Sequence, residues 1–157
     1  MKPHDLLKTA EILLSSGNGR PAAASLRRAT SSAYYAVFHC LARNCADLLI
    51  GVGGENHRKS AWHQVYRALE HGFAKSQCKN REMIKKFPKN IEDFANIFVL
   101  LQEKRHRADY DPSATFLKSE VKADIDQADQ AIGLFNAVSA GDRRAFCVYV
   151  LLKDRKG

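Results

Sequence analysis

The sequence predicts an all-α protein in which a single domain spans residues 1–157. Apolar residues recur at the spacing of helical turns in most segments, and no segment alternates apolar and polar residues over a useful length. Only 4 prolines and 9 glycines interrupt the 157 residues, which favours helices over many short strands. A chain of this length that is 45% hydrophobic can bury one real core. We therefore expect a bundle of about five to six helices.

The first two predicted helices cover residues 3–16 and residues 21–50. In the first, apolar residues follow helical spacing until Gly17-Asn18-Gly19 ends the pattern. Pro21 suits the first turn of the second helix, because its missing N–H would have no helical acceptor. No further proline or glycine occurs before Gly51, so this helix can reach about 40 Å.

The helix at residues 21–50 is expected to lie at the centre of the bundle. Its residues 21–46 include no acidic residue and no lysine, whereas a solvated helix normally carries both. Such a helix is covered on most sides. Opposite its apolar side runs a narrow polar stripe made of Arg28, Ser32, Tyr35 and His39. Polar side chains on a covered face need partners, either in the protein or in a ligand.

Further helices are predicted beyond Gly51. They are residues 60–73, a helix capped by Asn90 and stopped by Pro112, residues 117–138, and a short helix over residues 143–153. Between the first two lies a basic connector, residues 75–89, which includes Lys85 and Lys86. The connector can be a solvated loop, or it can contact the phosphate backbone of a nucleic acid.

A second group of chemically active side chains lies at residues 105–111. In a helix its members pair four residues apart, as Arg105 with Asp109, His106 with Tyr110, and Arg107 with Asp111. Acidic residues near a helix C-terminus oppose the helix dipole, so helix support alone does not explain them. A buried ion pair with another helix would explain these residues, and so would an anion held by the arginines. We expect this group to meet the polar stripe of residues 28–39 in space.

Composition limits the classes of function. The net charge of +8 and the pI near 9.5 are compatible with an anionic partner and equally with simple solubility. The 4 cysteines form no C-x-x-C pair, which indicates reduced, packed thiols in a cytoplasmic protein. His39 and His106 have no metal-ligand spacing, so neither a metal nor a cofactor is expected. The N-terminus does not read as a signal peptide, and no apolar run is long enough for a membrane span.

Together, the two groups resemble the HEPN superfamily. The resemblance rests on Arg28-Ala-x-x-x-Ala-Tyr34-Tyr35-Ala-x-Phe38-His39, followed much later by Leu101-Gln-x-x-Arg105-His106-x-Ala-Asp109-Tyr110-Asp111-Pro112. More narrowly, the chain is similar to small stand-alone bacterial HEPN proteins with an Ala-Asp-Tyr motif. The likeness spans about residues 4 to 152.

This resemblance implies an up-and-down bundle that pairs as a homodimer. Many HEPN proteins are metal-independent endoribonucleases, often toxins beside a nucleotidyltransferase antitoxin, and others bind RNA or nucleotides without cleaving. In the nuclease members, four to six residues separate an arginine from a histidine near the end of a late helix. After Arg105 the corresponding positions hold Tyr110, Asp111 and Pro112, so this chain departs from that motif.

The sequence is compatible with two hypotheses from different functional classes. In the first, an RNA-binding protein or ribonuclease uses Arg105 and Arg107 for phosphate, His106 or Tyr110 for proton transfer, and Asp109 within the same motif. Arg28, Tyr35 and His39 would line the same cleft, and Lys85 and Lys86 would add phosphate contacts. In the second, the cluster is a structural network of a non-catalytic dimeric interaction module. A small-molecule enzyme has no supporting motif.

Overall fold

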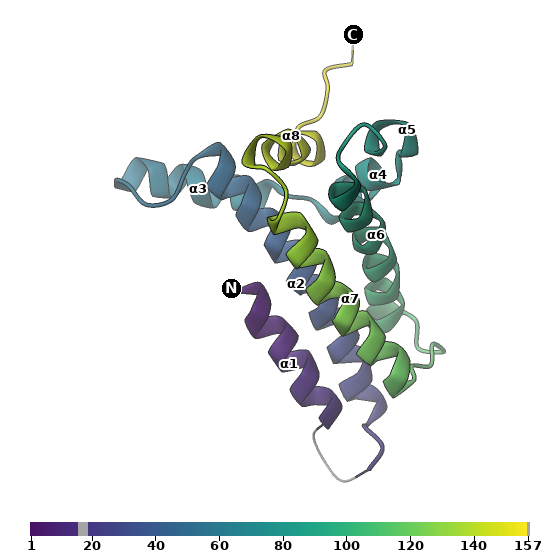
Figure 1. Cartoon of the computed structure of the whole chain (residues 1–157). Helices are drawn as coiled ribbons and strands as arrows, with labels where there is room; N and C mark the ends of the chain where they lie inside the picture. Colours follow the sequence, from purple (N-terminus) through teal and green to yellow (C-terminus); the bar gives the residue numbers. More distant parts are fainter. Residues whose placement is uncertain (16–18, 157) are drawn as a thin grey trace.

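The computed structural model describes residues 1–15 and 19–156, and within those ranges it contains eight helices and no strand. The helices are α1 (Pro3–Ser15), α2 (Ala23–Leu49), α3 (Asn56–Ala68), α4 (His71–Lys79), α5 (Arg81–Ile84), α6 (Lys89–Tyr110), α7 (Lys118–Asn136) and α8 (Ala140–Leu151). The predicted all-α class is confirmed, although the expected number of helices was too low. The long helices α1, α2, α6 and α7 lie along one another, and α3 projects from one end of the molecule (Figure 1).

Helix α2 is the centre of the bundle, as the sequence predicts. It packs against α1, α3, α6, α7 and α8. Its buried side includes Tyr34, Val37 and Leu41, none of which exposes any surface. Small residues along α2 let neighbouring helices approach closely, and burying an aromatic or branched side chain contributes about 1.5–3 kcal/mol. The helix begins at Ala23, two residues later than predicted, because Ala22 has an extended backbone at the N-cap position.

The region after Gly51 differs most from the prediction. A single helix over residues 60–73 is wrong: α3 ends at Ala68, Leu69 and Glu70 are extended, and α4 begins at His71. Helix α3 has no buried residue, whereas the Leu69 side chain is 6% exposed and belongs to the core. The break lets the chain pass from α3, which contacts α2, to α4, which contacts α6 and α8.

The predicted basic connector at residues 75–89 is mostly helical. Helix α4 extends to Lys79 and the short α5 follows, because Ala74, Cys78 and Ile84 are buried in the core. The prediction that Asn90 caps the next helix is also wrong, since α6 begins at Lys89 with Pro88 at its N-cap.

The remaining helix ends lie close to their predicted positions. Helix α6 stops at Tyr110, two residues before Pro112, and α7 occupies Lys118–Asn136. Helix α8 begins earlier than predicted because the Ser139 hydroxyl accepts a hydrogen bond from the Asp142 backbone N–H at 3.3 Å. Of the predicted Gly17-Asn18-Gly19 break, only Gly19 lies inside the described residues, where its φ of +91° suits a glycine.

Two further findings concern the predicted environment. All four cysteines are buried and free, which confirms the prediction of packed thiols. Within residues 1–15 and 19–156, no helix combines the length and hydrophobicity needed to span a bilayer.

Candidate functional site

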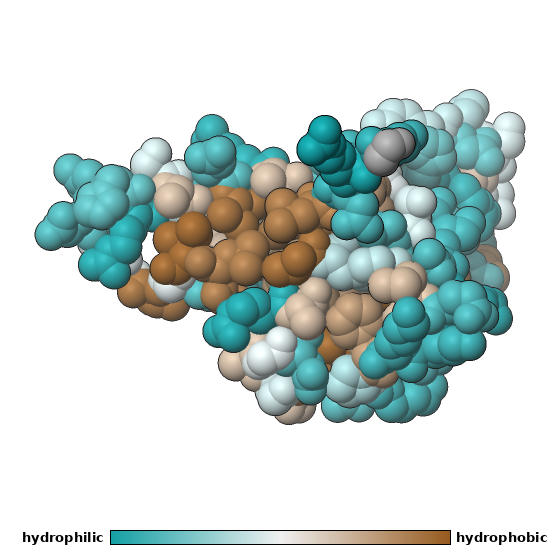
Figure 2. All heavy atoms as spheres, turned by 90° about the horizontal axis from the view of Figure 1, so that it is seen from above, coloured by the Kyte–Doolittle hydropathy of each residue, from teal (hydrophilic) through white to brown (hydrophobic). Residues whose placement is uncertain are grey.

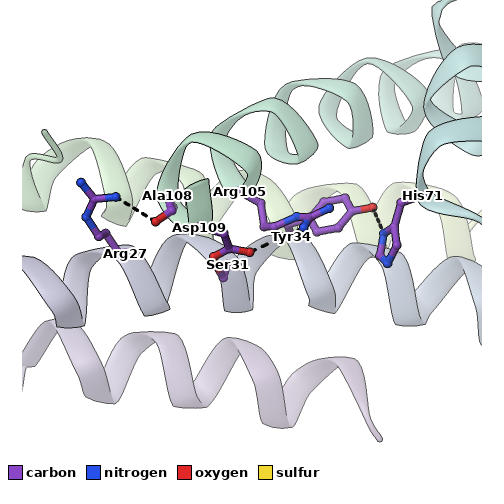
Figure 3. A network of polar contacts seen from close by, with 7 residues as sticks. All are labelled: Arg27, Ser31, Tyr34, His71, Arg105, Ala108 and Asp109. Carbon is purple, nitrogen blue, oxygen red and sulfur yellow. Dashed lines mark hydrogen bonds and ion pairs between the residues drawn. The ribbon is translucent and has the colours of Figure 1, made fainter. Parts of the chain in front are cut away.

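The two distant groups of polar residues meet where α2 lies beside the C-terminal end of α6 (Figure 3). The Ser31 hydroxyl donates a hydrogen bond of 2.5 Å to Oδ1 of Asp109. The guanidinium carbon of Arg105 lies 5.2 Å from the centre of the Tyr34 ring and 5.7 Å from that of Tyr35. The two segments therefore converge as predicted, although Tyr35 is the member of the predicted stripe in these contacts and the others come from Ser31 and Tyr34 beside it on α2.

Arg27 joins α2 to the segment that follows α6. Its Nη1 donates to the carbonyl oxygens of Ala108 at 2.9 Å and Asp111 at 2.8 Å. Its Nη2 donates to those of Pro112 at 3.4 Å and Ala114 at 2.6 Å. The last carbonyls of a helix lack partners within the helix, and a cation is favourable there. This role was not predicted from the sequence. The absence of any acidic residue near Arg27 in α2 could have indicated that its partner lies in another segment.

Arg105 lies beneath the surface of the site. Only 8% of the residue is exposed, and its Nη1 lies 3.5 Å from Oδ2 of Asp109. Its Nε atom is buried and has no hydrogen-bond partner within the described part of the chain. The rings of Tyr34 and Tyr35 cover the guanidinium, which supports a cation–π interaction. Arg105 is therefore positioned to hold helices together, and the structure does not place it where a phosphate in solvent could reach it.

The other residues of the second group face solvent at the end of α6. His106 and Tyr110 have ring centres 4.9 Å apart, as the four-residue spacing predicts, and Tyr110 is 67% exposed. Arg107 lies over the ring of Phe116, 5.7 Å from its centre, while Asp111 Oδ1 accepts a hydrogen bond from the Ser113 N–H at 2.9 Å. The expected facing of Arg107 and Asp111 is thus replaced by two separate contacts.

A surface hollow of about 680 Å³ lies between α2 and the end of α6, and we call it the α2–α6 groove. Its lining includes Arg28, Ser32 and Tyr35 from α2 and Asp109 and Tyr110 from α6. Arg28 is exposed and has no hydrogen-bond or ion-pair partner among the described residues. The groove thus offers one unpaired cation, several hydroxyl groups and an exposed aromatic ring.

A histidine that sequence reasoning missed lies at the edge of this site. His71 begins α4, its Nδ1 is 2.6 Å from the Tyr34 hydroxyl oxygen, and its ring stacks on Phe38 at 4.0 Å between centres. Burial lowers the pKa of His71, and the charges of Arg105 and His39 lower it further. Burial also raises the pKa of Tyr34 far above its usual range, against the opposing effect of Arg105. No sequence signal marked His71, because it lay inside a wrongly predicted helix.

His39 lies farther along the polar stripe of α2, as predicted, but outside the α2–α6 groove. Its Nδ1 forms a short hydrogen bond with the Tyr66 hydroxyl of α3. Burial lowers the pKa of His39, and the amino group of the chain's N-terminus lowers it further.

The structure does not bring Lys85 and Lys86 to the groove. They follow α5, near the N-terminal end of α6, whereas the groove lies at the opposite end of this 22-residue helix. A helix of that length spans about 33 Å. Lys85 instead pairs with Glu82 at 2.9 Å. The prediction grouped these lysines with the stripe by charge alone, which carries no information about position.

Comparisons of the chain with protein-family models, curated proteins and solved structures found no match. Within the described ranges, no three histidine, cysteine or acidic residues are grouped as a metal ion would require.

Proposed function

We propose that the α2–α6 groove binds single-stranded RNA, or a nucleotide, as in the RNA-binding members of the HEPN superfamily. The observation that carries this proposal is the unpaired, exposed Arg28 in a hollow of about 680 Å³ that also presents Ser32, Tyr35 and Tyr110. A hollow of this volume matches small-ligand sites in size. The net charge of +8 adds a general attraction for a polyanion.

Each group of the groove has a part in this proposal. The fork of donors on Arg28 suits two oxygens of one phosphate. The hydroxyls of Ser32 and Tyr35 can exchange hydrogen bonds with a ribose, whose 2′-hydroxyl distinguishes RNA from DNA. The exposed ring of Tyr110, backed by His106, offers a face on which a base can stack.

The same residues favour binding over cleavage. Metal-independent cleavage needs a group that takes the 2′-hydroxyl proton and a group that stabilises the phosphate charge, both touching the substrate. Arg105 is buried beneath Tyr34 and Tyr35, so stabilisation of the phosphate charge would fall to Arg28 or Arg107. His106 is the exposed candidate for taking the 2′-hydroxyl proton. Cleavage is tested by incubating RNA with the protein in the presence of a chelator, with His106→Ala as the control. Intact RNA in both incubations would agree with binding without cleavage.

Fluorescence anisotropy with a labelled tetra-adenylate RNA tests the binding proposal. We expect Arg28→Ala to weaken binding and to reduce the slope of log affinity against log salt by about one. Arg81→Ala removes the same charge from α5, away from the groove, and should leave affinity and slope nearly unchanged. Absence of salt-sensitive binding by the wild-type protein, or equal effects of the two substitutions, would refute the proposal.

A second candidate function is supported by a different observation. Arg105, Asp109 and Ser31 form a partly buried network, which fits a structural rather than a chemical role for this cluster. Figure 2, which looks down on α8 and the projecting α3, shows a continuous area of hydrophobic side chains. Val148 of α8 and the following Leu152 are among the exposed large hydrophobic residues. Such a surface can serve as an interaction site for another protein, and a second copy of this chain is the partner that the homodimer hypothesis names.

Light scattering after size-exclusion chromatography tests this second candidate. A dimer that becomes a monomer in Val148→Glu, while RNA binding is absent in both, would support it. A wild-type monomer at high micromolar concentration would refute the homodimer.

A further inference from the structure

The polar stripe of α2 continues past the α2–α6 groove toward the end that carries α3. Tyr35, His39 and Arg43 follow one another at four-residue intervals, so they lie along one side of the helix. The ring centres of Tyr35 and His39 are 6.2 Å apart. The two side chains are half-exposed, and neither the Tyr35 hydroxyl nor His39 Nε2 has a partner within the described ranges. This side of α2 therefore presents unused polar atoms to solvent.

Helix α3 extends the same row of rings. His39 stacks with Tyr66 at 5.7 Å between centres, and Tyr66 stacks with Trp62 at 5.2 Å. Trp62 is held in place because its Nε1 donates a hydrogen bond of 2.8 Å to Asp47 Oδ1 of α2. These side chains are half-exposed although α3 buries no residue of its own. Val65 and Tyr66 pack against the edge of the core, and this anchors α3 while the rings of its row stay half-exposed and able to meet a ligand.

The row ends at a second hollow, of about 210 Å³, which Trp62 lines together with Arg43 and Lys59. Arg43 also lines a neighbouring hollow that includes Lys2 and Arg143. Asp47, which belongs to both hollows, is the acidic residue of their linings. The hollow thus places the Trp62 ring beside two cations, Arg43 and Lys59, and an aromatic ring with nearby cations is the combination that single-stranded nucleic acids bind.

We propose that one single strand of RNA runs from the α2–α6 groove, over Tyr35 and His39, to a base-binding hollow at Trp62. This inference rests on the proposed function and adds to it the length and course of the strand. Arg28 and Arg43 are separated by a helical rise of about 22 Å. Stacked nucleotides rise about 3.4 Å each, so the path takes about six or seven nucleotides. Arg28 and Arg43 hold phosphates at its two ends, and a base enters the hollow against Trp62.

The chain contains 1 tryptophan, so the fluorescence of Trp62 reports on the far end of the path without any substitution. The probes are oligoadenylates of four and twelve nucleotides. We expect the twelve-nucleotide RNA to quench Trp62 and to bind at least about fivefold more tightly than the shorter one. Trp62→Ala should remove that gain, since stacking of one base accounts for about this factor or more. Trp62→Phe, which keeps a ring, should retain part of the gain.

Substitutions at the two ends test whether the path is continuous. Arg28→Ala should weaken binding of the long RNA and reduce quenching of Trp62 at a fixed RNA concentration. Lys59→Ala should weaken only the long RNA, and Lys86→Ala, a lysine away from the path, should affect neither length.

The outcomes separate this inference from the proposed function. If the short RNA binds in an Arg28-dependent manner but the long RNA neither gains affinity nor quenches Trp62, the extended path is wrong and the groove stands. If the long RNA quenches Trp62 and Arg28→Ala binds it as tightly as the wild type, RNA occupies only the Trp62 end and the continuous path is wrong. If neither RNA binds, both proposals fail.

Discussion

Replacing Arg27 by alanine should destabilise the protein more than any other single change at the surface of the site. The guanidinium donates to four backbone carbonyls between Ala108 and Ala114, three of them at 2.6–2.9 Å. It also lies 5.3 Å from the centre of the Phe116 ring. These contacts fix the segment that leads from α6 into α7, so their loss frees both the segment and the end of α6.

The magnitude follows from the number and exposure of these hydrogen bonds. A hydrogen bond from a charged donor contributes about 1.5–3 kcal/mol, but contributions from one group are not additive. Arg27 is half-exposed, so water can replace it at some carbonyls after truncation. We therefore expect a loss of about 2–4 kcal/mol in the free energy of unfolding. For a domain of this size that corresponds to a fall of about 5–15 °C in the melting temperature.

Thermal and urea denaturation followed by circular dichroism measure this loss. Arg28→Ala is the matched control, because the neighbouring arginine is exposed and unpaired and should cost less than about 0.5 kcal/mol. Arg27→Lys keeps the charge but not the fork of donors, so it should lie between the two. If Arg27→Ala and Arg28→Ala melt within about 2 °C of each other, the carbonyl contacts do not hold this segment.

Three further predictions concern the buried part of the site. Arg105→Ala should cost about 3 kcal/mol in urea denaturation because it removes both the cation beside Asp109 and the packing against Tyr34 and Tyr35, whereas Arg105→Met restores part of the packing but not the charge and should cost less; equal losses would contradict a packing contribution. Tyr34→Phe should cost about 1–2 kcal/mol by leaving His71 Nδ1 without its partner, and an unchanged melting temperature would contradict this. Melting temperature should fall as pH drops below about 6.5, because the lowered pKa of His71 makes the unfolded chain the stronger proton binder. His71→Gln should flatten that profile.

The sign of the pH effect follows from linkage. A histidine whose pKa is lower in the folded state contributes stability that is complete above its unfolded pKa, near 6.5. That stability is lost as pH falls below this value, until the pKa of the folded state is reached. The pKa of His39 is also lowered in the folded state, so the melting temperature of His71→Gln should still fall slightly as the pH drops. A melting temperature that rises on acidification from pH 7 to pH 5 would contradict the burial of both rings.

Periodicity predicted the helices whose buried faces are continuous, and it failed where a segment's burial changes along its length. Helix α2 was predicted almost to its ends, because its apolar side is regular and no proline or glycine interrupts it. The division between α3 and α4 could not be predicted, because Leu69 and Phe73 fit the spacing of one longer helix. Whether such a segment continues or breaks depends on the surface it packs against, which no local pattern contains.

The sequence by itself determined the helical class, the central position of α2 and the pairing of His106 with Tyr110. These depend on spacing along one helix, and spacing is a property of the chain. Only the tertiary structure decided that Arg27 ties the end of α6, that Arg105 is buried, and that His71 joins Tyr34. Charge and residue type are the same for an arginine beneath two tyrosine rings and for one in solvent. Their roles differ because packing between distant segments decides which side chain water, or a ligand, can reach.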